Sequence, residues 1–175
     1  MAKKVIEISL SERSIKKAIR ELEAYKLEVN RKCEELAKRL AQEGVVVAKM
    51  FLMSYSTALP PDVLPSIQWK AGDILANEST YIIFTDSENA MFIEFGTGIV
   101  GAQNPHPDPK PVTSSKTNLT YTKYDMNEHG YKGWVYRDDK GDWHWTRGMP
   151  AMPYMYNTVL DLYTKVSKIA REVFS

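Results

Sequence analysis

The sequence contains only one cysteine and three histidines in 175 residues, which excludes several kinds of site. Cys33 has no second cysteine with which to form an internal disulfide or a cysteine-ligated zinc site. The histidines stand far apart, and none forms the i, i+4 pair with which a helix binds a metal ion. We therefore expect no disulfide, no metal and no other cofactor. The three histidines are His106, His129 and His144.

The chain also lacks an apolar run near eighteen residues and a signal-peptide pattern after Met1. Together with the single thiol, these absences predict a protein that is kept in a reducing cytoplasm and has no membrane partner. The 23 basic and 22 acidic residues leave a formal net charge of +1, so there is no overall positive charge to attract a polyanion. We expect no sequence-specific nucleic-acid partner.

Motifs that mark common catalytic sites are missing as well. The sequence has no Gly-x-Ser-x-Gly elbow, no Gly-x-x-x-x-Gly-Lys phosphate loop and no Gly-x-Gly-x-x-Gly after a strand. The Gly96-Thr97-Gly98 segment is too short for any of these and is typical of a tight turn in which glycine supplies a positive φ, with ligand binding as the alternative. We predict that the protein is not an enzyme; a small hydrolase that uses histidine and carboxylate side chains is one rival.

The composition fits one domain that spans residues 1–175. With 43% hydrophobic and 26% charged residues and no break in composition, the chain can bury a core without disulfides. The patterns described below predict an α+β fold. In this fold a long N-terminal helix and a C-terminal helix pack on a small, mainly antiparallel sheet, with an inserted aromatic β-hairpin.

A long amphipathic helix is predicted for the N-terminal part. Ser9 and Glu12 have the spacing of a capping box, so we expect the helix to begin there, after a short strand in residues 5–10. One stripe of the helix is apolar apart from Lys26, and it fits either a coiled coil or, as we favour, a helix that packs on the protein's own sheet. Cys33 on this stripe is then a small buried side chain. The stripe consists of Ile15, Ile19, Leu22, Val29, Cys33, Leu36 and Leu40.

The next segment is almost wholly apolar. Residues 45–53 fit a strand or a buried helix, and we favour a helix that continues to about Tyr55. The prolines at 60–61 end it, because proline has no backbone N–H to donate. Residues 67–75 and 81–84, rich in β-branched and aromatic side chains, predict two antiparallel strands.

Residues 99–147 form a polar excursion. In residues 104–111 every second residue from 105 onward is proline, which favours an extended arm or loop with His106 exposed. Its second part has aromatic residues on both sides of an Asp-Lys-Gly turn, which predicts a β-hairpin in which Trp134 pairs with Trp143 or Trp145. One face of such a ribbon is apolar and must cover the domain's own sheet or a neighbour, because a lone two-stranded ribbon is marginal in water.

Two short segments about fifty residues apart carry the strongest signal. Ala90-Met91-Phe92-Ile93-Glu94-Phe95-Gly96-Thr97-Gly98 places one carboxylate in an apolar run that ends at glycines. Gly148-Met149-Pro150-Ala151-Met152-Pro153-Tyr154-Met155 is a proline-punctuated turn that leads into a predicted C-terminal helix. In this order, after a long helix and strands, they resemble the head-tail joining or tail-completion family of long-tailed bacteriophages and prophages, from about Glu12 to Val173.

The resemblance implies a structural role in the neck of a virion. The protein would join a hexameric or dodecameric ring of identical subunits that links the head to the tail tube, in the bacterial cytoplasm during assembly and then in the virion. Its partners would be itself and other neck, connector or tail-tube proteins. The candidate motif and interface residues are Glu94, Phe95, Gly96, Thr97, Gly98, Trp134, Trp143, Trp145, Pro150, Pro153 and Tyr154.

The resemblance also implies that the two motifs meet. Pro150 and Pro153 would set the entry of the C-terminal helix, whose first turn loses nothing from a missing amide. Tyr154 would then enter the core beside Phe92 and Phe95, against the element that orients the carboxylate of the first motif.

Glu94 needs a partner if it is buried, because an unpaired buried charge costs several kcal/mol. The backbone amides near residues 96–98 are the partners we favour, and a cationic residue of a neighbouring subunit is the alternative.

A single-stranded nucleic-acid-binding module is the alternative function. Exposed Trp143 and Trp145 near Lys140 and Arg147 would suit base stacking. The acidic residues of the hairpin turn weigh against it.

Overall fold

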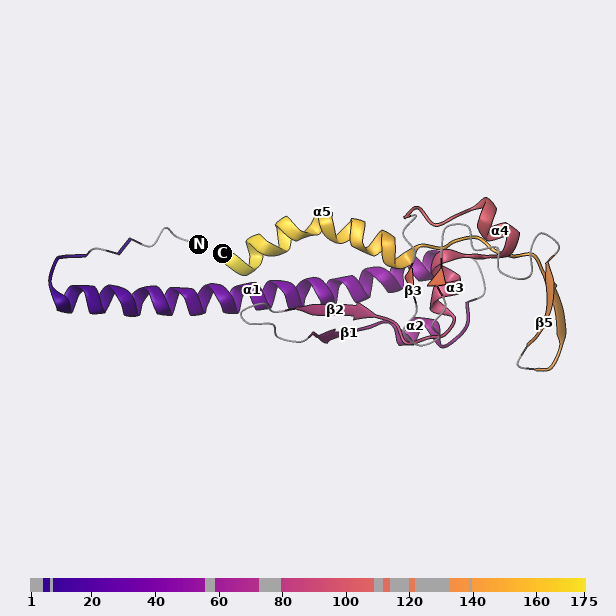
Figure 1. Cartoon of the computed structure of the whole chain (residues 1–175), viewed down its shortest axis with the longest axis horizontal. Helices are drawn as coiled ribbons and strands as arrows, with labels where there is room; N and C mark the ends of the chain where they lie inside the picture. The colour runs from indigo at the N-terminus through magenta and orange to yellow at the C-terminus, as the bar shows by residue number, and fades with distance from the viewer. Residues whose placement is uncertain are drawn as a thin grey trace.

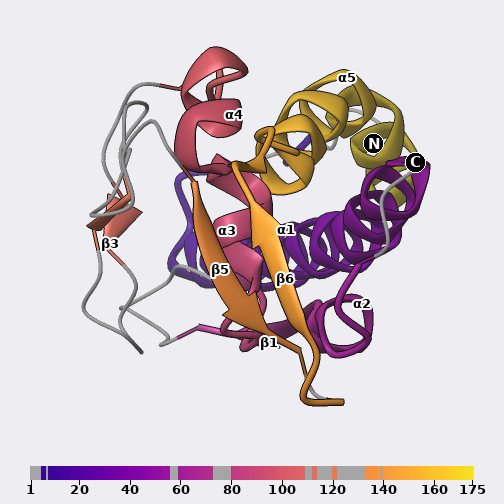
Figure 2. The same ribbon diagram turned by 90° about the vertical axis from the view of Figure 1, so that its right-hand side faces the viewer.

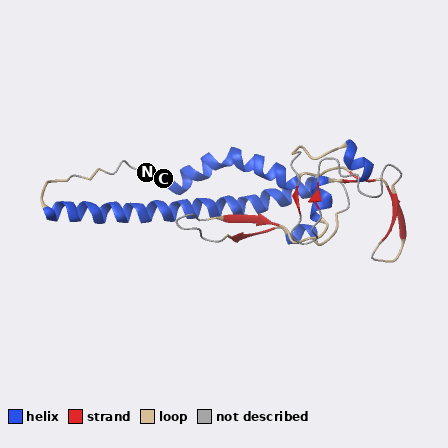
Figure 3. Ribbon diagram, in the orientation of Figure 1, coloured by secondary structure: helices blue, strands red, loops and turns tan. Residues whose placement is uncertain are grey.

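The computed structural model describes residues 5–6, 8–55, 59–72, 80–108, 112–113, 120–121, 133–138 and 140–175. Figure 1 shows an elongated molecule built along one long helix, α1, with helix α5 on one side of its C-terminal half and a short β-ribbon on the other. Helices dominate these residues and strands are short (Figure 3). The predicted α+β class, with long N-terminal and C-terminal helices, is confirmed.

Helix α1 spans Glu12–Ser54 without a break. The prediction of helix for residues 45–53 is therefore confirmed. The predicted capping box is shifted: Ser11, not Ser9, is the N-cap, and its hydroxyl accepts from the amide of Ser14 at 3.3 Å. The expected strand is wrong for the described residues among 5–10, which carry no strand.

Helix α5 spans Tyr154–Phe174 and packs along the C-terminal half of α1. Gly44 marks the close approach, because a Cβ there would lie 3.1 Å from the Leu162 side chain. Lys165 of α5 pairs with Glu43 of α1 at 2.8 Å. Ser175, which follows α5, lies beside Lys32 of α1. The Lys32 ammonium donates to the Ser175 carbonyl oxygen at 3.3 Å.

Strands β1 (Gln68–Ala71) and β2 (Tyr81–Phe84) form the predicted antiparallel pair, with Gln68 opposite Phe84. They follow the short helix α2 (Val63–Ser66) and lie against α1, where Ile83 meets Gly44. The part of the first predicted strand beyond residue 72 lies outside the described residues.

The core lies where α1, α2, α3 and the start of α5 meet. Helix α3 spans Ala90–Phe95, within the first motif. The core side chains come from segments far apart in sequence, so the fold is closed by long-range packing. They are Ala48, Leu52, Val63, Ile67, Ile93, Met152 and Tyr154.

The excursion begins with a short helix that lies before its proline-rich part, and the described residues 104–108 of that part carry no helix or strand, as predicted. Helix α4 spans Gly98–Gln103, and the carbonyl of Asn104 accepts from the amide of Ala151 at 3.0 Å. Strands β3 (Val112–Thr113) and β4 (Thr120–Tyr121) form one short pair, and β5 (Trp134–Arg137) and β6 (Trp143–Thr146) form the predicted hairpin. The described strands form separate two-stranded ribbons, of which β1–β2 is the small antiparallel sheet that we expected and β5–β6 the inserted hairpin.

The N-terminal half of α1 extends beyond α5 and the β1–β2 ribbon (Figure 1). Its stripe is exposed at Ile15, Ile19 and Leu22, so the prediction that the whole stripe packs on the protein's own sheet is wrong there. Cys33 was expected to be buried but is exposed. It lies next to Lys32, where α5 ends, so α5 does not cover it.

Candidate functional site

The two sequence motifs meet and form the candidate site. The amide of Met152 donates to the carbonyl of Ile93 at 2.8 Å. Thr97 and Met149 form one antiparallel bridge, and Gly98 forms a second with Gly148 in β7 (Gly148–Met149). The predicted contact between the motifs, 50 residues apart in sequence, is therefore confirmed as a backbone contact.

Glycine permits this close approach. Gly96 and Gly98 have φ of 73° and 59°, so the predicted tight turn with positive φ is confirmed. A Cβ at Gly96 would lie 2.6 Å from the amide nitrogen of Ala151, and one at Gly98 would lie 2.6 Å from the carbonyl oxygen of Arg147. Side chains at these two positions would push the motifs apart.

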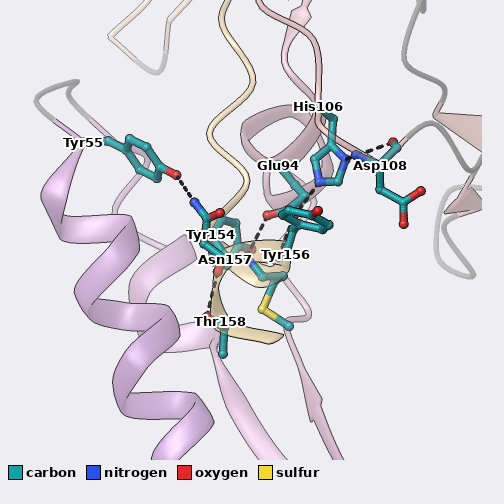
Figure 4. Close-up of polar contacts among 9 residues, drawn as sticks. Tyr55, Glu94, His106, Asp108, Tyr154, Tyr156, Asn157 and Thr158 are labelled. Atoms are coloured by element: carbon teal, nitrogen blue, oxygen red, sulfur yellow. Dashed lines mark hydrogen bonds and ion pairs between the residues drawn. The ribbon is translucent and has the colours of Figure 1, made fainter. Parts of the chain in front are cut away.

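Glu94 caps the start of α5 from another element. Its side chain comes from α3 and the residue is 7% exposed. Oε2 accepts from the amide of Met155 at 2.9 Å and Oε1 from the amide of Tyr156 at 3.0 Å (Figure 4). Pro153, the N-cap residue, makes no side-chain cap of its own. The partners that we favoured for Glu94, the amides near residues 96–98, are wrong for this structure, because the carboxylate reaches amides 61 and 62 residues away.

The electrostatics of this position suit a carboxylate. The first amides of a helix have no partner within the helix, and they carry the positive end of its dipole. A negative side chain that accepts two of them satisfies buried donors and gains charge-assisted hydrogen bonds. We call Glu94, His106 and the amides of Met155 and Tyr156 the Glu94 cluster.

His106 is the third donor in the Glu94 cluster. Its Nε2 lies 3.1 Å from Glu94 Oε1, and the residue is 4% exposed, so the expected exposed loop position is wrong. The ring centroid lies 4.6 Å from that of Phe95 and 5.3 Å from that of Tyr156. Nδ1 faces the backbone of Asp108, 3.0 Å from its N–H and 3.1 Å from its carbonyl oxygen. The neutral ring accepts the first and the protonated ring donates to the second, so both forms have a partner.

The cluster shifts nearby pKa values. Burial lowers the pKa of His106, but the hydrogen bond to Glu94, the Asp108 backbone and the two carboxylate charges outweigh it, so the pKa is raised above its usual 6.5. Burial and the Glu94 charge raise the pKa of Tyr154 far above its ordinary value. Tyr55, which accepts from Asn157 Nδ2 at 3.4 Å, also has a raised pKa from burial and from Glu94.

Tyr154 is fully buried, as predicted, but its neighbours differ from those expected. It belongs to the core cluster with Ile93 and Met152, whereas Phe92 and Phe95 are only half-buried. The helical turn of α3 explains the difference, because Ile93 and Glu94 face inward together and the phenylalanines lie on either side of them. Phe95 instead covers the ring of His106.

A groove of about 640 Å³ opens beside the Glu94 cluster. β2, α3 and the first turns of α5 line it, mostly with apolar side chains. Glu94 and His106 lie in its wall, but three N–H groups already occupy the carboxylate. This arrangement holds two motifs together and leaves Glu94 poorly placed to act as a general base.

The hairpin carries the remaining candidate residues. Val135 lies opposite Trp145 and Arg137 opposite Trp143, so these four side chains share one face of the ribbon. Trp134 lies opposite Thr146, so the predicted tryptophan pair across the strands is wrong. Its ring lies against Gly98 instead, 2.7 Å from where a Cβ would be, and this contact attaches the root of the hairpin to the first motif.

The hairpin turn is built around Asp138. Its carboxylate accepts from the amides of Lys140 and Asp142 at 3.0 and 2.8 Å and faces His144 Nε2 at 2.9 Å. The hydrogen bond with His144 is the main reason why the pKa of Asp138 is lowered. The Asp138 carboxylate is thus used within the hairpin.

Among the described residues, no group of three or more histidine, cysteine or acidic side chains is placed to hold a metal ion. No helix in the described part of the chain is long and apolar enough to cross a membrane. No family model, curated protein or solved structure matches the chain.

Proposed function

We propose that the protein is a structural virion component, a tail-completion or head-tail connector subunit that acts by protein-protein assembly. The observation that carries this proposal is the exposed, mainly apolar face of the hairpin, which Arg137 shares. Val135, Trp143 and Trp145 are 55%, 69% and 61% exposed on that face. Contiguous exposed apolar side chains of this size mark interaction sites, because leaving them in water is costly.

The position of this face supports an assembly role. The hairpin lies at one end of the elongated molecule, opposite the tip of α1 (Figures 1 and 2). Trp134 fixes its root against Gly98, so the exposed tryptophans are carried on an anchored ribbon. A subunit that offers different surfaces at different ends makes heterologous contacts, the kind from which closed rings are built.

A complementation experiment tests this proposal. In a lysogen that lacks the gene, we expect filled heads and free tails that remain unjoined in electron micrographs. The wild-type gene should restore joined particles, and the double variant Trp143→Ser, Trp145→Ser should not. Thr146→Ser, a matched change on the other face of β6, should restore them. Joined particles at wild-type number with the double variant would contradict the proposal.

Binding of single-stranded nucleic acid is the second candidate, and one observation favours it. The Arg137 guanidinium lies 5.8 Å from the centre of the exposed Trp143 ring, an arrangement of cation and aromatic surface that also suits base stacking. The test is fluorescence titration with a single-stranded oligonucleotide at low and high salt. Salt-sensitive binding that the Trp143→Ser variant loses would support this function, and absence of binding at low salt would exclude it.

A further inference from the structure

Strand β2 pairs with β1 along one edge and has no strand on its other edge in the described part of the chain. Beside β1, the amide of Gly72 donates to the carbonyl of Thr80 at 2.8 Å, so these two residues form a hydrogen-bonded pair. Such pairs alternate along an antiparallel ladder. The N–H and C=O of Ile82 therefore point toward β1, and those of Tyr81 and Ile83 point away from it. Among the described residues, no hydrogen bond reaches these outward groups.

The groove beside the Glu94 cluster runs along this outer edge. Residues 81–85 all line it, together with Met155, Thr158 and Val159 of α5, whereas its described lining includes no residue of β1. A row of unpaired backbone groups beside an apolar groove suits an extended chain, whose backbone pairs with the edge and whose alternate side chains enter the groove. The ligand that this site recognises is therefore another β-strand.

The chain also carries a strand-like segment without a partner. Ile6, Ile8 and Leu10 alternate with polar residues, which is a strand pattern, yet the described residues among 5–10 form no strand. Val5 and Ile8 are 72% and 60% exposed, and Leu10 is fully exposed. A segment of this pattern becomes a strand only where a neighbouring edge completes its backbone hydrogen bonds.

The segment cannot reach β2 of its own chain. Its end is tied to the first turn of α1, where the amide of Ser9 donates to Ser14 Oγ at 2.9 Å. Strand β2 begins beside Glu34, which accepts from the Tyr81 hydroxyl at 3.4 Å. Glu34 lies 20 residues after Ser14, a rise of about 30 Å along the helix. An extended chain from Ser9 back to Val5 covers at most about 14 Å.

Figure 1 agrees with this estimate, because the N-terminal segment lies at the tip of α1 and away from β2. The length of chain before α1 thus excludes the pairing within one copy. A second copy has no such restriction, since its β2 edge can approach the segment from outside.

We propose that residues 5–10 of one copy add as a strand to the outer edge of β2 in a second copy. The outward N–H and C=O groups of Tyr81 and Ile83 pair with the backbone of the segment, and its apolar side chains enter the groove beside α5. Each copy gives one segment and accepts one, so the copies link into oligomers. This contact joins identical chains and stands whether or not the oligomer belongs to a virion.

Sedimentation of the full-length protein tests the contact with two matched double variants. Glu7→Pro, Ile8→Pro removes two consecutive N–H groups, so the segment loses a donor whichever alternate set faces β2. Ala2→Pro, Lys3→Pro introduces the same residues before the segment. We expect oligomers for the wild-type protein and for the variant at 2 and 3, and monomers with unchanged helix content for the variant at 7 and 8.

Two sedimentation results would overturn the proposal. One is a wild-type protein that stays monomeric up to about 100 µM, where micromolar association is nearly complete. The other is equal association of the two double variants.

Amide hydrogen exchange identifies the edge that is used. The amides of Tyr81 and Ile83 should exchange at least about tenfold more slowly in the wild-type oligomer than in Glu7→Pro, Ile8→Pro. The amide of Ile82, which pairs with β1 in both proteins, is the internal control and should change little. Oligomers in which Tyr81 and Ile83 exchange as fast as in that variant would contradict strand addition at β2.

Discussion

At the scale of single residues, Glu94 connects the two motifs more than any other side chain. It satisfies two amides at the start of α5 and one donor of His106, while Pro153 supplies no cap. The sequence alone predicted that Glu94 needs a partner and that Tyr154 is buried. It did not predict the partners of Glu94. His106 is 12 residues away in an irregular loop, and the amides of α5 are more than 60 residues away. No periodic pattern in the sequence links such positions.

Removal of the Glu94 carboxylate should destabilise the domain strongly. Glu94→Ala leaves two amides of α5 and a buried imidazole without their partner, so we expect a loss of about 3 kcal/mol in the free energy of unfolding. Chemical denaturation followed by circular dichroism measures it. The control is Glu88→Ala, at an exposed carboxylate just before α3, with an expected change below about 0.5 kcal/mol. Similar losses for the two variants would contradict the capping role.

The pair of His106 and Glu94 makes stability depend on pH. Because the folded pKa of His106 lies above 6.5, its protonation adds stability that is fully present below pH 6.5 and is lost as the pH rises through the folded pKa. The difference in unfolding free energy between the wild-type protein and His106→Gln should therefore be larger at pH 6 than at pH 9. In a Glu94→Gln background this pH dependence should become smaller, because the charge-assisted hydrogen bond to Glu94 is lost while the contributions of Asp108 remain. A difference that grows toward pH 9 would show that the sign is wrong.

At the scale of elements, local signals predicted most of the helices and strands. Four signals depend on near neighbours in sequence: the apolar periodicities of α1 and α5, the prolines after α1 and the aromatic residues of the hairpin. The structure has both helices, the end of α1 before the prolines, and the hairpin. What failed depends on distant contacts. The stripe of α1 is periodic along its whole length, but periodicity does not show that α5 ends near Lys32 and leaves Cys33 exposed.

Gly98 should tolerate no side chain. Gly98→Ala adds a Cβ at φ 59°, against the Arg147 carbonyl and the Trp134 ring, so both the backbone contact between the motifs and the root of the hairpin must shift. We expect a loss of about 2 kcal/mol. The matched change Gly72→Ala, at a glycine without positive φ where a Cβ would lie 3.2 Å from Thr80, should cost less. The comparison of thermal unfolding of the two variants decides, and an equal or smaller loss for Gly98→Ala would contradict this account.

The start of α5 should depend on the packing of Tyr154. Tyr154→Ala empties a fully buried position in the core, and a loss of about 3–5 kcal/mol is expected, as for other large-to-small aromatic changes. Because Tyr154 and Ile93 belong to the same core cluster, the double variant with Ile93→Val should lose less than the sum of the two single variants. Urea denaturation of the four proteins measures the coupling. Additive losses would mean that α3 and α5 are not packed as one unit.

At the scale of the whole molecule, the two motifs are used inside the fold, and two of its exposed apolar surfaces lie at its ends. The Glu94 cluster joins α3 to α5, and the aromatic hairpin and the stripe of α1 remain accessible. Such a division fits a subunit whose fold is set by its motifs and whose action depends on what its ends contact. The proposed place of that action is the neck of a virion, where a subunit is retained in the finished particle.

Quantification of the protein in purified particles tests this central claim most directly. Mass spectrometry with isotope-labelled reference peptides gives the number of copies relative to the portal protein. The account predicts that the protein is retained in joined, washed particles at a fixed ratio that corresponds to one hexameric or dodecameric ring. Its absence from joined particles that are otherwise complete, while it is abundant in the lysate, would contradict the proposed structural role.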